Sequence, residues 1–153
     1  MIIIENICKH QQYEEIVVNW LYKEWGHKNS YQFWSDWIKY SKDENSTFQT
    51  FVISDNGKLV GTYGIMPIDL QSRQDLTPWI GNLFIDYKYR TNSLKYFSAL
   101  HEHCNTLCRN LNLTKVYVFT PHSSIVFKRY GFKYFESTVT EEGKKINLLF
   151  KTY

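Results

Sequence analysis

Residues 79–120 read WIGNLFIDYKYRTNSLKYFSALHEHCNTLCRNLNLTKVYVFT, and this stretch decides the fold. Residues 79–86 are apolar enough to form a central strand that is buried on both faces. Residues 93–111 have helical spacing, because one face collects Phe97, Leu100, Cys104, Leu107 and Leu111. Residues 115–120 form a second strand. A helix of this length must cross over the sheet, so the two strands are predicted to be parallel.

Further predicted elements lie on both sides of this unit. Apolar residues recur at steps of three and four between residues 10 and 25, which is typical of an amphipathic helix. The predicted apolar face comprises Tyr13, Ile16, Val17, Trp20 and Leu21. Asp55-Asn56-Gly57 indicates a hairpin turn, because Asn and Gly tolerate positive φ angles. The other predicted elements are a strand at 2–7, a helix capped by Ser30, strands at 48–54 and 58–66, a short helix at 122–130, and strands at 132–138 and 146–152. The expected fold class is α/β, a mixed sheet of about seven strands flanked by about four helices.

The composition is that of one globular domain. The chain has 153 residues, 43% of them hydrophobic and 22% charged, so we expect a single domain spanning 1–153. The net charge of +3 is too small to favour a nucleic-acid surface. No stretch reaches the roughly 20 apolar residues of a membrane span, and the N-terminal apolar run is too short for a secretion signal. Three cysteines suit a reducing compartment, so the expected location is cytoplasmic.

Three segments carry a resemblance to a known family. Residues 73–86 (RQDLTPWIGNLFID) look like the approach to the fourth strand in one bacterial branch of the GNAT family of N-acetyltransferases. Residues 89–95 (YRTNSLK) stand where that family has an Arg/Gln-x-x-Gly-x-Gly/Ala loop. Residues 116–120 (VYVFT) and 127–132 (FKRYGF) resemble its fifth strand and its Tyr-x-x-x-Gly-Phe ending. The resemblance covers about residues 48–152 and implies the acyl-CoA N-acyltransferase fold, with acetyl-CoA as cosubstrate and an amine as acceptor.

The resemblance places the pyrophosphate of coenzyme A at the start of the helix that begins near residue 93. The residues concerned are Arg90, Thr91, Asn92, Ser93, Leu94 and Lys95. A helix start suits phosphate, because unpaired N–H groups and the helix dipole both favour anions. Ser93 and Lys95 replace the family's two glycines, which let the backbone approach the phosphate closely, but Arg90 is retained and Lys95 adds a positive charge. The alternative is an ordinary helix start without a ligand, capped by Asn92 or Ser93.

The resemblance also implies a binding place for the thioester. It places the pantetheine arm along the backbone of Leu83, Phe84 and Ile85, in a gap between the fourth and fifth strands, where an N–H stabilises the oxyanion. These residues fit a core strand in either case. Phe127 stands where the family often has the tyrosine that protonates the departing thiolate. It has no proton to give, although a thiol pKa near 8.5 makes thiolate a tolerable leaving group.

Two residues are taken as catalytic candidates. Tyr130 is close to Phe127 in sequence and its hydroxyl can donate a proton, although core packing is the alternative role for its ring. Asp69 is the candidate base that takes a proton from the amine, which must be neutral to attack. Each carboxylate taken singly can instead be a solvated surface charge. Further candidates are His122 and Ser123 for the proton donor, and Asp75 and Glu24 for the base.

Two other patterns in the sequence each have a functional and a structural interpretation. His101, Cys104 and Cys108 share a helical face, but a structural zinc site needs four ligands, so we expect no metal. An aromatic group precedes residue 41 and can line the acceptor pocket through cation–π contacts, or simply pack in the core. Its members are Trp25, Trp34, Trp37 and Tyr40.

The predicted function is transfer of an acetyl group from acetyl-CoA to an amine of a small molecule or peptide, by direct attack. The alternative is a catalytically inactive acyl-CoA-binding regulatory module, favoured by Ser93, Lys95 and Phe127. A nucleic-acid binder ranks below both, because its short basic run comprises only Lys128, Arg129 and Lys133. The expected partners are therefore acetyl-CoA and an amine acceptor, with neither nucleic acid nor membrane. A homodimer is left open, because dimers are frequent in the family.

Overall fold

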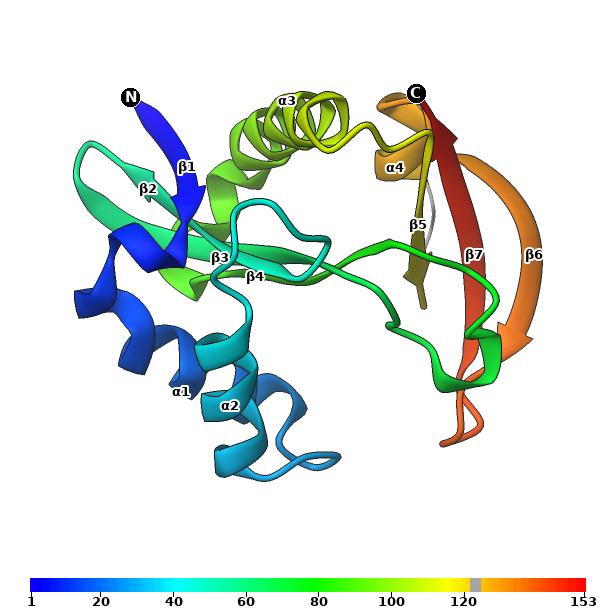
Figure 1. Ribbon diagram of the computed structural model, residues 1–153, viewed down its shortest axis with the longest axis horizontal. Coiled ribbons are helices and arrows are strands. Elements are labelled where there is room, and N and C mark those ends of the chain that lie inside the picture. Colours follow the sequence, from blue (N-terminus) through cyan, green and yellow to red (C-terminus); the bar gives the residue numbers. More distant parts are fainter. Residues whose placement is uncertain (122–124) are drawn as a thin grey trace.

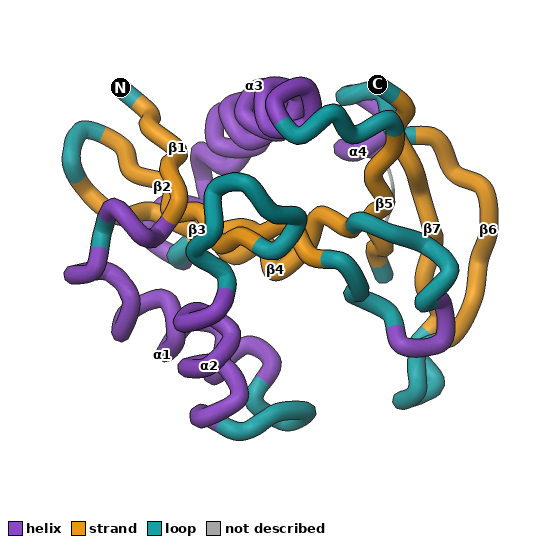
Figure 2. Tube along the Cα trace, viewed as in Figure 1, coloured by secondary structure: helices purple, strands orange, loops and turns teal. Residues whose placement is uncertain are grey.

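The computed structural model describes residues 1–121 and 125–153. They form one mixed sheet with helices on both faces (Figure 1, Figure 2). The strands are β1 (Ile2–Asn6), β2 (Gln49–Asp55), β3 (Lys58–Met66), β4 (Trp79–Ile85), β5 (Lys115–Thr120), β6 (Lys133–Val139) and β7 (Lys145–Thr152). The helices are α1 (Glu14–Trp25), α2 (Tyr31–Tyr40), α3 (Ser93–Asn110) and α4 (Ile125–Arg129). The strand order is β1-β2-β3-β4-β5-β7-β6.

The pairing confirms the predicted fold class. β4 and β5 are parallel and joined by α3. The other neighbouring strands of the described sheet are antiparallel. The crossover helix therefore has the role that the sequence predicted for residues 93–111.

Two layers of helix cover the sheet. α3 packs its buried Leu100 and Cys104 onto one face, against Phe51 and Ile80. α1 and α2 lie on the opposite face (Figure 1) and bury a second cluster that includes Leu21. Burial of these apolar faces is the main driving force for the arrangement.

The local turn chemistry is partly as predicted. Asn56 and Gly57 have φ angles of 51° and 81°, which confirms the β2–β3 hairpin turn. The hydroxyl of Ser30 accepts a hydrogen bond from the Phe33 N–H at 3.1 Å, which confirms the cap of α2. Asn92 occupies the N-cap position of α3, but its side chain makes no capping hydrogen bond, so its predicted capping role was wrong.

The first helix is shorter than predicted. Residues 7–13 contain two 3-10 turns, and α1 begins only at Glu14. Ile16, assigned to its apolar face, is 43% exposed, whereas Val17, Val18 and Leu21 are buried. The predicted helix at 122–130 is described only from Ile125, because residues 122–124 lie outside the described part of the chain.

Candidate active site

β4 and β5 separate soon after they begin. In the described sheet a single residue pair joins them, Trp79 with Tyr117, and the Tyr117 N–H donates to the Pro78 carbonyl at 3.0 Å. Past this pair, β5 diverges from β4 and continues the sheet through β7 (Figure 1). The backbone of residues 83–85 therefore has no strand partner on the β5 side. Unpaired N–H and C=O groups at such a place are available to an extended ligand.

β4 is distorted where it faces this gap. Asn82 and Leu83 together oppose the single residue Tyr63, and the β3–β4 register shifts at that point. Asn82 has a φ of 52°, and the two-against-one pairing defines a β-bulge. The Asn82 Nδ2 is buried and has no hydrogen-bond partner among the described residues. Bulges re-aim backbone groups and side chains, so this one is a candidate for contacting a bound thioester.

The β4–α3 connection forms the other end of the gap. It is a 3-10 segment, η4 (Tyr87–Asn92), and its exposed Arg90 lies over the Tyr87 ring at 3.7 Å. The Arg90 Nε donates to the Ile85 carbonyl at 2.8 Å, which holds the cation at the end of β4. Thr91, Asn92 and Leu94 are exposed and Ser93 is half-buried, so the start of α3 is open to solvent.

Lys95 has a different environment. Its Nζ lies 3.0 Å from the Asp55 Oδ2, in an ion pair with the β2–β3 hairpin. The Tyr96 hydroxyl donates to the same carboxylate at 2.9 Å. The positive charge that the sequence suggested for the phosphate site is thus already paired with Asp55.

Phe127 and Tyr130 pack against α3. The Phe127 ring meets Phe97 and His101 edge-on, at centroid distances of 6.4 and 6.0 Å. The Tyr130 ring stacks on His101 at 4.1 Å. The structure thus gives Tyr130 the packing role that was its alternative. Its role as proton donor stays a prediction, and His122 and Ser123 lie outside the described residues.

His101 itself was considered only as a metal ligand. It is 4% exposed, and its Nε2 has no hydrogen-bond partner in the described part of the chain. Burial lowers its pKa to about 4, with a smaller effect in the same direction from the charge of Lys151. The imidazole is therefore neutral at pH 7. Among the described residues, no three His, Cys, Asp or Glu side chains are grouped as a metal ion requires.

Asp69 lies over β4 next to the bulge. A Cβ built on Gly81 would be 2.6 Å from the Asp69 Oδ2, so the carboxyl group occupies the space above this glycine. Burial raises the pKa of Asp69 to about 7, and the positive charge of Lys28 acts in the opposite direction. A carboxyl group that titrates near neutral pH can both accept and release a proton, as a general base must.

The alternative bases are placed differently. Asp75 is exposed and its carboxylate receives two hydrogen bonds from Arg73, at 3.1 and 3.0 Å. Arg73 also pairs with Glu136 of β6, so Asp75 belongs to an ion-pair group that fastens the β3–β4 loop. Glu24 is exposed on α1. Hydrogen bonds from Arg73 lower the pKa of Asp75, whereas burial raises that of Asp69 to about 7.

The aromatic group near α2 forms part of the packing below β4. The Trp37 ring meets the Phe48 ring edge-on at a centroid distance of 4.8 Å. The Trp34 ring is tilted against Trp37 at a centroid distance of 5.8 Å and is buried. Tyr40 is 64% exposed and takes no part in this cluster. The core-packing alternative therefore describes Trp34, and Tyr40 faces solvent.

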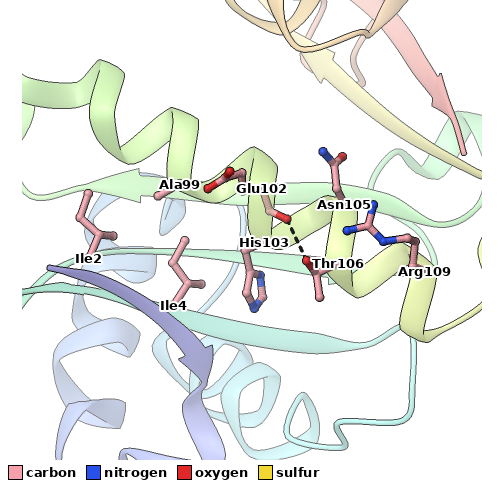
Figure 3. Close-up of a pocket in the computed structure, with 8 residues that line it drawn as sticks. All are labelled: Ile2, Ile4, Ala99, Glu102, His103, Asn105, Thr106 and Arg109. Atoms are coloured by element: carbon pink, nitrogen blue, oxygen red, sulfur yellow. Dashed lines mark hydrogen bonds between the residues drawn. The ribbon is translucent and has the colours of Figure 1, made fainter.

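A separate groove of about 480 Å³ lies between β1 and the outer side of α3 (Figure 3). Ile2 and Ile4 line one wall, and Glu102, His103 and Arg109 line the other. His103 is hydrogen-bonded to the buried Tyr63 hydroxyl at 2.6 Å. α3 stands between this groove and β5 (Figure 1), so the groove is not part of the candidate active site.

Several features of the candidate site were not predicted from the sequence. The Gly81-Asn82 pair inside a strand was the one local signal, because glycine in a strand often marks a bulge. No sequence signal indicated that the charge of Lys28 acts on Asp69 or that the Nε2 of His101 lacks a partner among the described residues, because both depend on how distant segments pack.

None of the helices in the described part of the chain has the length and apolar character of a membrane span.

Solved structures share this fold over almost the whole chain. The spermidine N-acetyltransferase chimera from Vibrio cholerae and hSSAT has a TM-score of 0.74 at 15% identity, covering 99% of this chain and 95% of that one. An aminoglycoside 6'-N-acetyltransferase complexed with coenzyme A has a TM-score of 0.70 at 12% identity, covering 98% and 96%. A GNAT-family acetyltransferase from Streptococcus pneumoniae has a TM-score of 0.68 at 16% identity, covering 100% of both chains.

No family model matches the sequence. No curated protein matches it either. At identities of this size the structural likeness establishes the fold, which is that of the GNAT N-acetyltransferases, and leaves the chemistry to be argued from the site.

Proposed function

We propose that the protein transfers an acetyl group from acetyl-CoA to an amine of a small molecule or peptide. The observation that carries the proposal is the Asp69 carboxyl group, which has a pKa of about 7 and covers Gly81 beside the β4 bulge. An amine with a free pKa near 10 must lose a proton before it attacks, and a base of this kind accepts it. The neighbours named above, one of which holds coenzyme A, support the same chemistry.

The gap and the loop provide the binding elements for acetyl-CoA. The pantetheine arm would lie along the β5 side of Leu83, Phe84 and Ile85, where β4 has no strand partner. The pyrophosphate would lie at the exposed start of α3 beside the Arg90 guanidinium, where the helix dipole and the cation both favour an anion, although the Ser93 N–H already donates to the Arg90 carbonyl. This anion site comprises Arg90, Thr91, Asn92, Ser93 and Leu94, whereas Lys95 takes part only if it leaves Asp55.

The reaction follows as one direct transfer. Asp69 takes a proton from the acceptor ammonium, and the neutral nitrogen attacks the thioester carbon. The C–N bond forms as the C–S bond breaks, and the sulfur leaves as a thiolate. The nitrogen then loses its second proton, which reaches the thiolate directly or through solvent. The β4 backbone and Asn82 Nδ2 are the donors available to the developing oxyanion.

Protonation of the departing thiolate requires little assistance from the protein. Tyr130 remains the candidate donor to the thiolate, but its ring is stacked on His101. Phe127 has no proton to give. Because a thiol pKa is near 8.5, the thiolate can leave with little assistance, and solvent can supply the final proton.

A second candidate function is an acyl-CoA-binding regulatory module without turnover. It is favoured by Phe127, which packs against Phe97 and His101, and by the pairing of Lys95 with Asp55. This module would bind the cofactor but acetylate no amine.

Calorimetric titration with acetyl-CoA, followed by turnover on an amine panel, tests both candidates. Micromolar one-to-one binding with turnover supports the transferase, and binding without turnover supports the module. Absence of binding at millimolar acetyl-CoA contradicts both.

A further inference from the structure

An ion pair links the α1–α2 loop to the β6–β7 turn. Lys28 lies in the loop between α1 and α2, and Glu142 lies in the turn between β6 and β7. The Lys28 Nζ is 2.8 Å from the Glu142 Oε1. The His27 Nε2 is 3.5 Å from the Glu142 Oε2. One carboxylate thus faces two basic side chains of the opposite loop.

The Lys28 ammonium also acts on the candidate base. Its positive charge opposes the effect of burial on the Asp69 carboxyl group. The same ammonium therefore acts on two carboxyl groups, Asp69 over β4 and Glu142 in the β6–β7 turn. The protein thus already holds a cation of its own whose charge reaches Asp69.

This cation is held loosely. The side chains of Lys28 and Glu142 are 45% and 39% exposed. Exposed ion pairs contribute little to stability, because water screens the charges and two flexible side chains must be ordered. An incoming ammonium can replace Lys28 on Glu142 while Lys28 moves into solvent without leaving a buried charge.

We propose that Glu142 is a specificity-determining residue that binds a second ammonium group of the acceptor, in the place that Lys28 and His27 occupy in the free protein. The inference rests on the proposed function, because it assumes that Asp69 receives the reacting amine. The reacting nitrogen must be neutral, so it cannot remain paired with Glu142. Acceptors with two ammonium groups are therefore favoured over acceptors with one.

The test compares 1,5-diaminopentane with 1-aminopentane, which have the same carbon chain but differ by one ammonium group. Glu142→Gln should raise KM for the diamine roughly fivefold and leave KM for the monoamine unchanged. Lys28→Met should lower KM for the diamine, because the resident competitor is gone. Glu141→Gln is the matched control, because it removes the same charge from the neighbouring residue and should change neither value.

Two results would overturn the inference. Equal changes of KM for both amines in Glu142→Gln would mean that Glu142 only ties the two loops together. Unchanged KM for both would mean that the acceptor does not reach it.

Failure of the proposed function would look different, since neither amine would then be acetylated by any variant. In that case calorimetric titration of the diamine, in the presence of coenzyme A, still decides the role of Glu142. A diamine Kd that is weaker in Glu142→Gln than in Glu141→Gln supports it, and equal values reject it.

Discussion

The carboxyl group of Asp69 lies on the Cα of Gly81, so closely that a Cβ at residue 81 would be 2.6 Å from the Asp69 Oδ2. This contact joins the β3–β4 loop to β4 one residue before the bulge at Asn82. It explains why a residue without a side chain stands inside a central strand, where glycine is otherwise unfavourable. It also places the Asp69 carboxyl group, whose pKa is raised by burial, at the edge of the β4–β5 gap.

Gly81→Ala should therefore displace the Asp69 carboxyl group. We expect a loss of activity of roughly tenfold or more, with a stability cost of about 1–3 kcal/mol from overpacking. Steady-state kinetics and chemical denaturation measure the two effects. In an Asp69→Asn background the same change should cost little further activity, because the displaced group no longer acts as a base. Full additivity of the two losses would argue against the contact as the cause.

Asp69→Asn should stabilise the protein at alkaline pH. The folded-state pKa of about 7 lies above that of an aspartate in an unfolded chain, so the folded protein binds the extra proton between these values. The wild-type free energy of unfolding should therefore fall between about pH 4 and pH 7 through this residue, and then level off. The variant should be more stable by on the order of 4 kcal/mol at pH 8 and nearly equal at pH 4. Urea denaturation at both values checks this, and a variant less stable at pH 8 would contradict it.

The stacking of Tyr130 on His101 predicts that its ring matters more than its hydroxyl. Tyr130→Phe should lower kcat only about two- to threefold and leave the melting temperature unchanged. Tyr130→Ala should lower the melting temperature, since it removes a ring from the α3–α4 contact. A loss of kcat of about 100-fold in Tyr130→Phe, with stability intact, would instead identify the hydroxyl as the acid.

Arg90→Ala should weaken acetyl-CoA binding about tenfold if the start of α3 holds the pyrophosphate. Lys88→Ala is the matched control, because Lys88 is an exposed cation in the same 3-10 segment. Calorimetry gives both dissociation constants. The same loss in both variants would point to general charge attraction, and no loss in Arg90→Ala would remove this loop from the binding site.

The sequence was most informative where the structure depends on local pattern. The run of residues 79–120 predicted the parallel pair and its crossover helix, and Asn56-Gly57 predicted the hairpin turn. The prediction that Ile16 lies on the buried face of α1 was wrong. Helical spacing alone does not determine which edge of an apolar stripe contacts the sheet. The ion pair of Lys95 could not be predicted, since its partner Asp55 lies forty residues away in the chain, and contact of Lys95 with the phosphate stays a prediction. Asp69 was a candidate among three carboxylates. Its packing on Gly81 sets it apart from Asp75 and Glu24, which are exposed, and this packing depends on tertiary structure.

The most direct test of the proposed transfer is detection of an acetylated amine by mass spectrometry. Wild-type protein and Asp69→Asn would be incubated with acetyl-CoA and an amine panel between pH 6 and pH 9. We predict a product with the wild type, a rate that rises through about pH 7, and a loss of roughly 100-fold or more in Asp69→Asn. Acetyl-CoA binding without an acetylated product, or equal rates in the two proteins, would contradict the proposal.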